Sequence, residues 1–401
     1  MKKALAIIVI LVLICSFCIT SFANNNINYE AENTHSNQDD LNINAKSAIL
    51  MEAETKKILY SKNSEEALPP ASVTKIMTLL LAAEALAAEN FSENDLVSIS
   101  EYAASKGGSQ VYLEPNEKIS VRDLFKCTVI ASANDAAVAL AELVAGSEEA
   151  FVSQMNKRAQ ELGLTSTTFQ NATGLDDTVT NHLTSAADIA IMSAELIKHD
   201  IILEYSSMWQ DTIRDGAFVL TNTNRLVRYY DGCNGLKTGS TDKAGFCISA
   251  TAKRNGMQLI AVVMGAETRD IRNSEAKKLL DYGFSTYSLY KQPQREIGSV
   301  RVLKGATDEA ILISESVAII VPKGTEKSIE VKTNTPESIL APVDTLSNVG
   351  SVEYWLNGEK IAESKILVKD GIDKISFIDF YLRLLSSVFN PNQEYSNLQN
   401  N

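Results

Sequence analysis

The hydrophobic and polar positions divide the chain into a helical middle and two flanking regions of strand character. Residues 72–88 are apolar on nearly every side, which is typical of a helix buried in the centre of a domain. Helical spacing and capping residues predict further helices at residues 124–130, 135–145, 151–162, 187–197 and 273–282. The middle of the chain is therefore expected to be mainly helical.

Short apolar runs typical of β-strands lie on both sides of this helical region. Residues 47–51 and 57–60 predict a hairpin, and strands are also predicted at residues 233–238, 245–252 and 258–264. An Asn-Gly pair joins the last two and is a strong hairpin signal. We expect an α+β domain over residues 46–292, with one antiparallel sheet that contains strands from both ends and is covered by helices.

After Pro293 the pattern changes to short β-rich runs that continue to residue 368. They predict a small all-β sandwich domain over residues 293–372. In residues 373–390, apolar side chains recur at helical spacing and predict an amphipathic helix, followed by a polar tail over residues 391–401. The apolar face of this helix can dock on the sandwich or lie in a membrane surface, and its aromatic residues favour the membrane.

The N-terminus has the layout of a secretory signal peptide. Lys2 and Lys3 precede an apolar run, and small residues near Ala23 predict cleavage there, so residues 1–23 would be removed. An uncleaved anchor is the alternative, although a run of about 16 residues is slightly shorter than the roughly 18 that span a bilayer. Residues 24–45 are polar and predict a flexible leader. We therefore expect an exported protein at the outer face of the cytoplasmic membrane or in the cell wall.

Charge and composition exclude several classes of protein. The formal net charge is −13, so the basic surface of a nucleic-acid-binding protein is not expected. Three scattered histidines form no metal-ligand cluster, and neither a metal nor another cofactor is expected. We interpret them as surface or helix-capping residues: they are His35, His182 and His199. The cysteines that remain after cleavage are odd in number and lack C-x-x-C spacing, so no disulfide framework is implied.

The first candidate for chemistry is Ser72-Val-Thr-Lys75, an S-x-x-K motif. Three other matches begin at Ser240, Ser274 and Ser288, so the tetrapeptide alone is not selective. Ser72, however, opens the long buried helix directly after a proline pair, which places it beside free backbone N–H groups. Lys75 lies one helical turn further on, within reach of the hydroxyl. It can act as a base only if burial and a second cation lower its pKa.

The tripeptide Lys237-Thr238-Gly239 supplies such a cation and occurs once in the chain. It lies on a predicted strand and is followed by Ser240. The strand edge can pair with an extended peptide, and Gly239 allows close approach of the backbone. Lys237 and Thr238 can hold a terminal carboxylate.

A third short motif, Ser132-Ala-Asn134, lies between two predicted helices. S-x-N also occurs at Ser61 and Ser92. A short connection between buried helices can present a hydroxyl and an amide to a cleft, and the alternative is that Ser132 or Asn134 caps a helix.

In this order the three motifs resemble the active site of penicillin-binding proteins and serine β-lactamases, although Ala133 replaces the Asp of S-D-N. Residues 70–78 (PASVTKIMT) and 235–246 (GLKTGSTDKAGF) resemble those of low-molecular-mass D-alanyl-D-alanine carboxypeptidases of serine peptidase family S11. The similarity runs from about residue 47 to the terminal helix. It implies an enzyme that removes the terminal D-alanine from peptidoglycan stem pentapeptides and is acylated by β-lactams.

The same resemblance implies roles for individual residues. Ser72 forms the acyl-enzyme, Lys75 removes its proton, Ser132 relays a proton to the departing D-alanine, and Asn134 holds the peptide. Lys237 tunes the site electrostatically.

Further residues are implied to bind substrate. Thr238 binds its carboxylate, and the N–H groups of Ser72 and Ser240 form the oxyanion hole. Arg272 matches an arginine that helps to bind the carboxylate, with Arg269 as the neighbouring alternative.

Two other functions compete with this interpretation. A β-lactamase needs an efficient deacylating base, and the nearest E-x-x-L-N string begins at Glu161, lacks the Asn and is better explained as a helix end at Gly163. A non-catalytic protein that binds the wall or senses β-lactams is the second alternative, and the intact motifs count against it.

Overall fold

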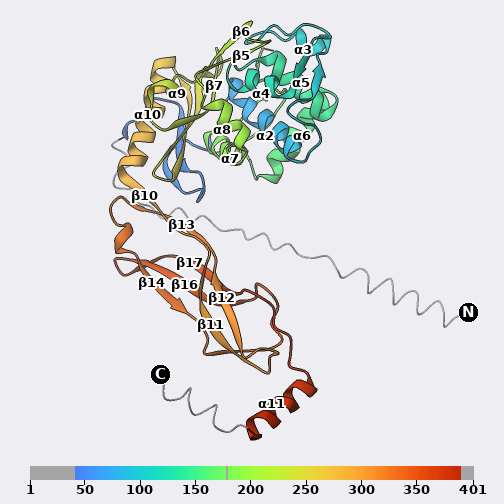
Figure 1. Cartoon of the computed structure of the whole chain (residues 1–401). Coiled ribbons are helices and arrows are strands. Elements are labelled where there is room, and N and C mark those ends of the chain that lie inside the picture. Colours follow the sequence, from blue (N-terminus) through green and yellow to red (C-terminus); the bar gives the residue numbers. More distant parts are fainter. Residues whose placement is uncertain (1–40, 178, 390–401) are drawn as a thin grey trace, which may run out of the picture. The chain divides into compact units, whose positions relative to one another are not determined.

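The structure is a computed structural model that describes residues 41–177 and 179–389 (Figure 1). The predicted signal peptide, most of the predicted leader and the polar tail lie outside the described residues. The packed chain begins earlier than expected, because Ile43 is 1% exposed and its carbonyl accepts a hydrogen bond from Lys62 Nζ at 2.6 Å. The last residues of the expected leader therefore belong to the folded domain.

A five-stranded antiparallel sheet organises the first domain, in the order β2-β1-β9-β8-β7. Its strands are β1 (Ser47–Glu52), β2 (Ile58–Lys62), β7 (Cys233–Thr241), β8 (Gly245–Arg254) and β9 (Met257–Ala266). Because β1 pairs with β9, strands from both ends of the domain meet in one sheet, as expected. Asn255 and Gly256 have φ values of 50° and 81°, the left-handed pair that a tight type I′ hairpin needs.

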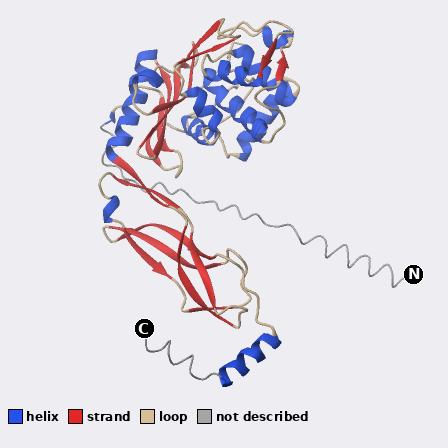
Figure 2. Ribbon diagram, viewed as in Figure 1, coloured by secondary structure: helices blue, strands red, loops and turns tan. Residues whose placement is uncertain are grey.

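Helices cover both faces of this sheet (Figure 2). One face packs against α10 (Arg269–Thr286) and the other against α7 (Ala186–Leu196), which in turn contacts the buried α2 (Lys75–Ala87). The remaining helices are η3 (Ala71–Thr74), α3 (Glu101–Ala104), α4 (Val121–Val129), α5 (Asn134–Ala145), α6 (Glu148–Glu161), α8 (Asp200–Ser206) and α9 (Leu226–Tyr229). The expected α+β fold class is confirmed.

Several short elements were not predicted from the sequence. They are β3 (Leu96–Ser98), which pairs with β4 (Lys118–Ser120), and β5 (Gln210–Ile213), which pairs with β6 (Phe218–Thr221). Strands of three or four residues are too short to show a hydrophobic period, and the partners β3 and β4 lie far apart in the sequence.

The second domain is all-β, as expected. A six-stranded sheet has the order β14-β16-β17-β12-β11-β15, and β10 (Tyr287–Gln292) pairs separately with β13 (Val317–Pro322). The six strands are β11 (Arg295–Leu303), β12 (Glu309–Ser314), β14 (Glu330–Asn334), β15 (Ser338–Leu340), β16 (Asn348–Leu356) and β17 (Glu359–Val368), and η4 (Glu326–Ser328) precedes β14. Side chains from both sheets, including Val321 and Tyr354, form one buried cluster.

Helix α11 (Phe377–Phe389) follows the second domain. Its described apolar side chains are largely exposed, with Phe377 at 82% and Ile378 at 70%. Arg383 Nη1 donates to Asp308 Oδ1 at 2.6 Å, so a polar contact ties the helix to the β domain. The side chains of Val388 and Phe389, which are part of the predicted apolar face, lie outside those described.

Candidate active site

Ser72 lies in the tight turn η3 that leads into α2, rather than in the α-helix itself. Ala71, just before it, has a φ of 50°, and Pro70 accepts a backbone hydrogen bond from Val73. Strand β7 runs beside this turn, and a Cβ on Gly239 would come within 2.7 Å of the Ser72 nitrogen. A glycine is therefore required where the Lys-Thr-Gly strand meets the turn that carries Ser72.

Lys75 is fully buried and forms three hydrogen bonds. Its Nζ lies 3.0 Å from Ser72 Oγ, 2.6 Å from Asn134 Oδ1 and 2.9 Å from the carbonyl oxygen of Thr173. A neutral amine can donate to the amide and carbonyl oxygens, which leaves its lone pair for the proton of Ser72. This is the arrangement that a general base requires.

Electrostatics favour that neutral amine. Burial, reinforced by the charge of Lys237, holds the pKa of Lys75 well below its usual value, and the Asp135 carboxylate opposes part of the shift. Asp135 is itself buried and accepts hydrogen bonds from the backbone N–H groups of Val111, Leu113 and Ala136.

The second and third motifs meet through a hydrogen bond. Lys237 Nζ donates to Ser132 Oγ at 2.7 Å, and both residues are buried. Burial, together with the charge of Arg272, lowers the pKa of Lys237 to about 7. A buried lysine with this pKa can exchange a proton with Ser132 near neutral pH.

Asn134 links the S-x-N motif to Lys75. It is the first residue of α5, and besides its contact with Lys75 it donates from Nδ2 to the Gly107 carbonyl at 2.7 Å. The N-cap of α5 is Ala133, without a side-chain capping bond, so neither Ser132 nor Asn134 caps this helix. The capping alternative considered from the sequence is therefore wrong.

Arg272 and Arg269 differ in their surroundings. Arg272 is 3% exposed, whereas Arg269 lies on the surface. Arg272 donates from Nε and Nη2 to Asn273 Oδ1, and no carboxylate among the described residues forms an ion pair with it. Burial, with the charges of Arg269 and Arg225, lowers its pKa to about 10. A buried cation without a counterion favours the binding of an anion.

The remaining predicted residues lie along the same strand. Thr238 is buried, and its Oγ1 donates to Thr223 Oγ1 at 2.9 Å, whereas the Ser240 side chain is exposed. The structure thus brings the three motifs together around Lys75 and Lys237.

Sequence reasoning missed the segment that faces Lys75 from the other side. Besides the Thr173 carbonyl, it includes Asn171, whose Oδ1 accepts hydrogen bonds from the N–H groups of Thr173 and Gly174 at 3.1 and 2.7 Å. Gly174 has a φ of 84°, and a Cβ there would lie 1.8 Å from the Ala71 carbonyl oxygen. The Asn-Ala-Thr-Gly string predicts a turn, but nothing in it indicates that this turn packs against Lys75.

The expectation of a surface or capping role is wrong for His182, which is 4% exposed. Its Nε2 lies 2.7 Å from Thr74 Oγ1, and its Nδ1 accepts a hydrogen bond from the Gln170 N–H. His199 precedes α8 without a side-chain capping bond, and His35 lies outside the described residues. In the part of the chain that the structure describes, no cluster of His, Cys, Asp and Glu could hold a metal ion.

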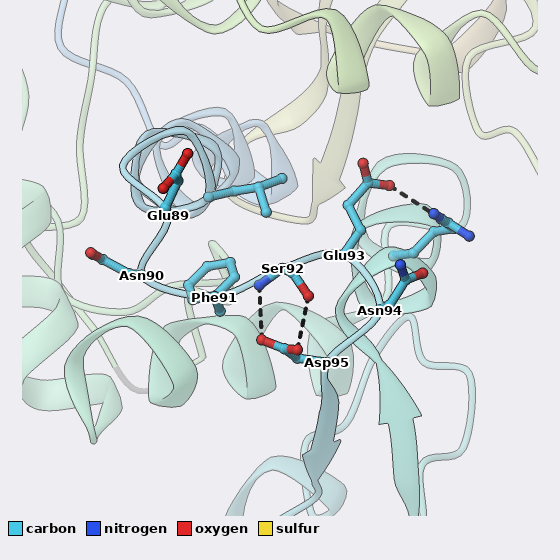
Figure 3. A pocket seen from close by; sticks show the side chains of 9 residues that line it. Glu89, Asn90, Phe91, Ser92, Glu93, Asn94 and Asp95 are labelled. Carbon is cyan, nitrogen blue, oxygen red and sulfur yellow. Dashed lines mark hydrogen bonds and ion pairs between the residues drawn. The ribbon is translucent and has the colours of Figure 1, made fainter.

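A hollow of about 650 Å³ lies near the opposite end of α2 (Figure 3). It is lined by Leu86 and by the polar loop that follows, where Asp95 accepts from Ser92 and Glu93 pairs with Arg122. Leu86 is roughly 16 Å along the helix from Lys75, at about 1.5 Å per residue. None of the motif residues lines this hollow.

A serine in a tight turn, a buried lysine as its base and a second Ser–Lys pair, on this sheet-and-helix scaffold, define a serine hydrolase of the β-lactamase and transpeptidase-like class. Residues 32–268 match the model of the D-alanyl-D-alanine carboxypeptidase family of S11 peptidases, and residues 284–374 match the C-terminal domain of penicillin-binding protein 5. The chain therefore belongs to the S11 family of D-alanyl-D-alanine carboxypeptidases.

Individual relatives match most of the chain. The D-alanyl-D-alanine carboxypeptidase DacF of Bacillus subtilis is 42% identical over 393 residues, which cover 96% of this chain and 98% of that protein. The DacC carboxypeptidase of Escherichia coli is 35% identical and covers 84% and 86%. The crystal structure of penicillin-binding protein 5 from Haemophilus influenzae is 33% identical, covers 83% of this chain and 98% of its own, and superimposes with a TM-score of 0.74. The predicted family is thus confirmed.

Proposed function

We propose that this protein removes the terminal D-alanine from peptidoglycan stem pentapeptides through an acyl-enzyme on Ser72. Family membership supports the carboxypeptidase activity. The observation that carries the assignment to Ser72 is the set of hydrogen bonds around Lys75. Two oxygen acceptors leave its lone pair directed at the Ser72 hydroxyl.

Acylation follows from this geometry. Lys75 takes the proton of Ser72 as Oγ attacks the carbonyl carbon between the two D-alanines, and the N–H groups of Ser72 and Ser240 receive the developing oxyanion. The C–N bond then breaks, and Ser132 passes its proton to the departing amine and takes one from Lys237, which donates a hydrogen bond to it. Water hydrolyses the ester and regenerates Ser72.

Recognition of the free carboxylate explains why this peptidase acts at a chain end. Two buried basic side chains and a hydroxyl lie close to the Lys-Thr-Gly strand. They belong to Lys237, Arg272 and Thr238. Arg272 forms no ion pair with a carboxylate among the described residues, so the substrate carboxylate would pair with it. Asn134 would hold the peptide beside the strand.

β-Lactams would enter by the same route, because attack of Ser72 on the strained lactam opens its C–N bond and leaves a tethered amine. A solved relative from Listeria monocytogenes, penicillin-binding protein D2, is 34% identical, has a TM-score of 0.56 and was determined in an ampicillin-bound form. It covers 61% of this chain and 99% of its own.

The test is labelling by fluorescent penicillin together with D-alanine release from a stem pentapeptide. Ser72→Ala should abolish both activities. Ser274→Ala is the matched control, because it removes a serine from another S-x-x-K string on the surface of α10 and should leave both unchanged. An unlabelled wild-type protein would support the non-catalytic alternative, and rapid penicillin turnover without D-alanine release would support a β-lactamase.

We further propose that the protein is exported and lies at the outer face of the cytoplasmic membrane through α11. The exposed apolar side chains of Phe377, Ile378 and Leu382 support a surface contact. Within the described residues, no helix is both long and apolar enough to span a bilayer. Cosedimentation with phosphatidylglycerol vesicles tests this: Phe377→Glu and Ile378→Glu, each as a single variant, should weaken binding, whereas Val331→Glu, the same charge on an exposed strand of the β domain, should not.

A further inference from the structure

His182 lies on the returning side of a loop that leaves the helical region and comes back to it. Thr168 pairs with Leu183 and closes the loop, so His182 stands opposite Phe169 and Gln170 at its neck. The ring is held on both sides, since Nδ1 is 3.0 Å from the Gln170 nitrogen and Nε2 is 2.7 Å from Thr74 Oγ1. A backbone N–H can only donate, so the neutral ring carries its proton on Nε2 and donates it to Thr74.

Thr74, which accepts this hydrogen bond, adjoins the residues proposed to react. It is buried, it ends the turn that carries Ser72, and it directly precedes Lys75. One turn further along α2, Thr78 Oγ1 donates to the carbonyl of Ala172 in the same loop at 2.7 Å. Between these two ties, Lys75 donates to the carbonyl of Thr173.

The direction of the Lys75 amine depends on that carbonyl. In its neutral form the amine has two N–H groups, which Asn134 and Thr173 accept, and only with both in place does the lone pair face Ser72. A shift of the loop relative to α2 would remove one acceptor and let the amine turn away from the hydroxyl.

We propose that His182 is a positioning residue for the reaction: by tying Thr74 to the loop, it keeps the Thr173 carbonyl on Lys75 and the Lys75 amine on Ser72. This inference rests on the proposed function, because it assigns the purpose of the tie to acylation of Ser72. A purely structural role, in which the ring only fills space against Phe169, is the competing explanation.

Four single variants separate the two explanations. His182→Phe keeps an aromatic ring but removes both hydrogen bonds, whereas His182→Gln keeps an acceptor and a donor about as far apart as in imidazole. Thr74→Val removes the hydroxyl at nearly constant volume, and Thr74→Ser keeps it. The measurement is the second-order rate of acylation by fluorescent penicillin, with the melting temperature recorded alongside.

We expect His182→Phe and Thr74→Val each to slow acylation about tenfold, and the double variant to be no slower than either single one, because both remove the same tie. His182→Gln and Thr74→Ser should retain rates within about threefold of the wild type. The pH dependence gives a second readout. Loss of the Thr173 acceptor destabilises the ammonium form of Lys75 more than the neutral amine, which lowers the pKa of Lys75. The acidic limb of the rate profile should therefore move to lower pH.

The outcomes are decisive even if one variant fails to fold. Should His182→Phe not fold, Thr74→Val alone carries the test. Wild-type acylation rates in folded Thr74→Val, additive losses in the double variant, or an unmoved acidic limb would overturn the positioning role while leaving the proposed function intact. Absence of labelling in the wild type would overturn the proposed function and this inference with it.

Discussion

Two of the four segments that match S-x-x-K, those that begin at Ser72 and Ser274, have surroundings that differ in every respect that matters for catalysis. Ser72 and Lys75 lie at a tight turn and a buried helix start, and Lys75 is fully buried. Ser274 and Lys277 lie on the exposed side of α10, where the Ser274 hydroxyl donates to the Ile271 carbonyl one turn earlier. The motif supplies the groups, but burial and neighbouring charges make Lys75 a base, whereas Lys277 is exposed to solvent.

The largest effect is expected when the lysine of each S-x-x-K segment is replaced in turn. Lys75→Ala should lower the acylation rate by about 10³-fold at pH 7, since a positioned general base contributes roughly 10²- to 10⁴-fold. Lys277→Ala should change the rate less than about twofold. Stopped-flow acylation of the two variants measures both. Comparable rates for them would mean that Lys75 is not the base.

The second largest effect is expected from a substitution where the Lys-Thr-Gly strand packs on the turn that carries Ser72. Gly239→Ala would bring a methyl group within 2.7 Å of the Ser72 nitrogen and 2.9 Å of the Val73 nitrogen, both backbone atoms. We expect acylation to fall about 100-fold and stability to fall by about 1–3 kcal/mol, the usual cost of overpacking. Acylation kinetics and urea unfolding measure the two effects, and an unaffected variant would show that strand and turn are not in contact.

The two arginines at the start of α10 extend the comparison to substrate binding. Arg272→Leu should raise KM for a stem pentapeptide about 10- to 100-fold with a smaller change in kcat, because a charge-assisted contact to the substrate carboxylate is lost. Arg269→Leu, at an exposed position, should change KM less than about threefold. Steady-state D-alanine release measures both constants. Equal effects of the two substitutions would argue against a specific contact with Arg272.

The last expected effect leaves catalysis aside and concerns stability at acid pH. Burial lowers the pKa of His182 to about 4 from an ordinary value of 6.5. The unfolded state therefore binds a proton that the folded state does not, so the contribution to stability is full above pH 6.5 and is lost as the pH falls toward 4, by up to about 3 kcal/mol. Urea unfolding at pH 7 and 4.5 should show a steeper loss for the wild type than for His182→Gln. Parallel losses would contradict a neutral buried imidazole.

Much of the scaffold was predictable because its signals are local. The apolar run of α2 and the Asn255-Gly256 turn are set by spacing and backbone preference, which the sequence carries directly. The strands of the pairs β3–β4 and β5–β6 are too short to show such a period, and β3 and β4 also pair across the intervening helix α3. The sequence favoured Arg272 over Arg269 through the family resemblance alone, because the physical difference between the two is one of burial in the folded domain.

The sequence by itself determined the family, the order of the three motifs and the choice of the serine that lies just before the buried helix. Only the tertiary structure decided that Thr173 presents a backbone carbonyl to Lys75 and that His182 is buried against Thr74. A backbone carbonyl has no side-chain signature, and the burial of a histidine depends on segments about 100 residues apart in the chain. The sequence motifs identify the groups proposed to react, whereas the packing that orients these groups depends on long-range contacts in the fold.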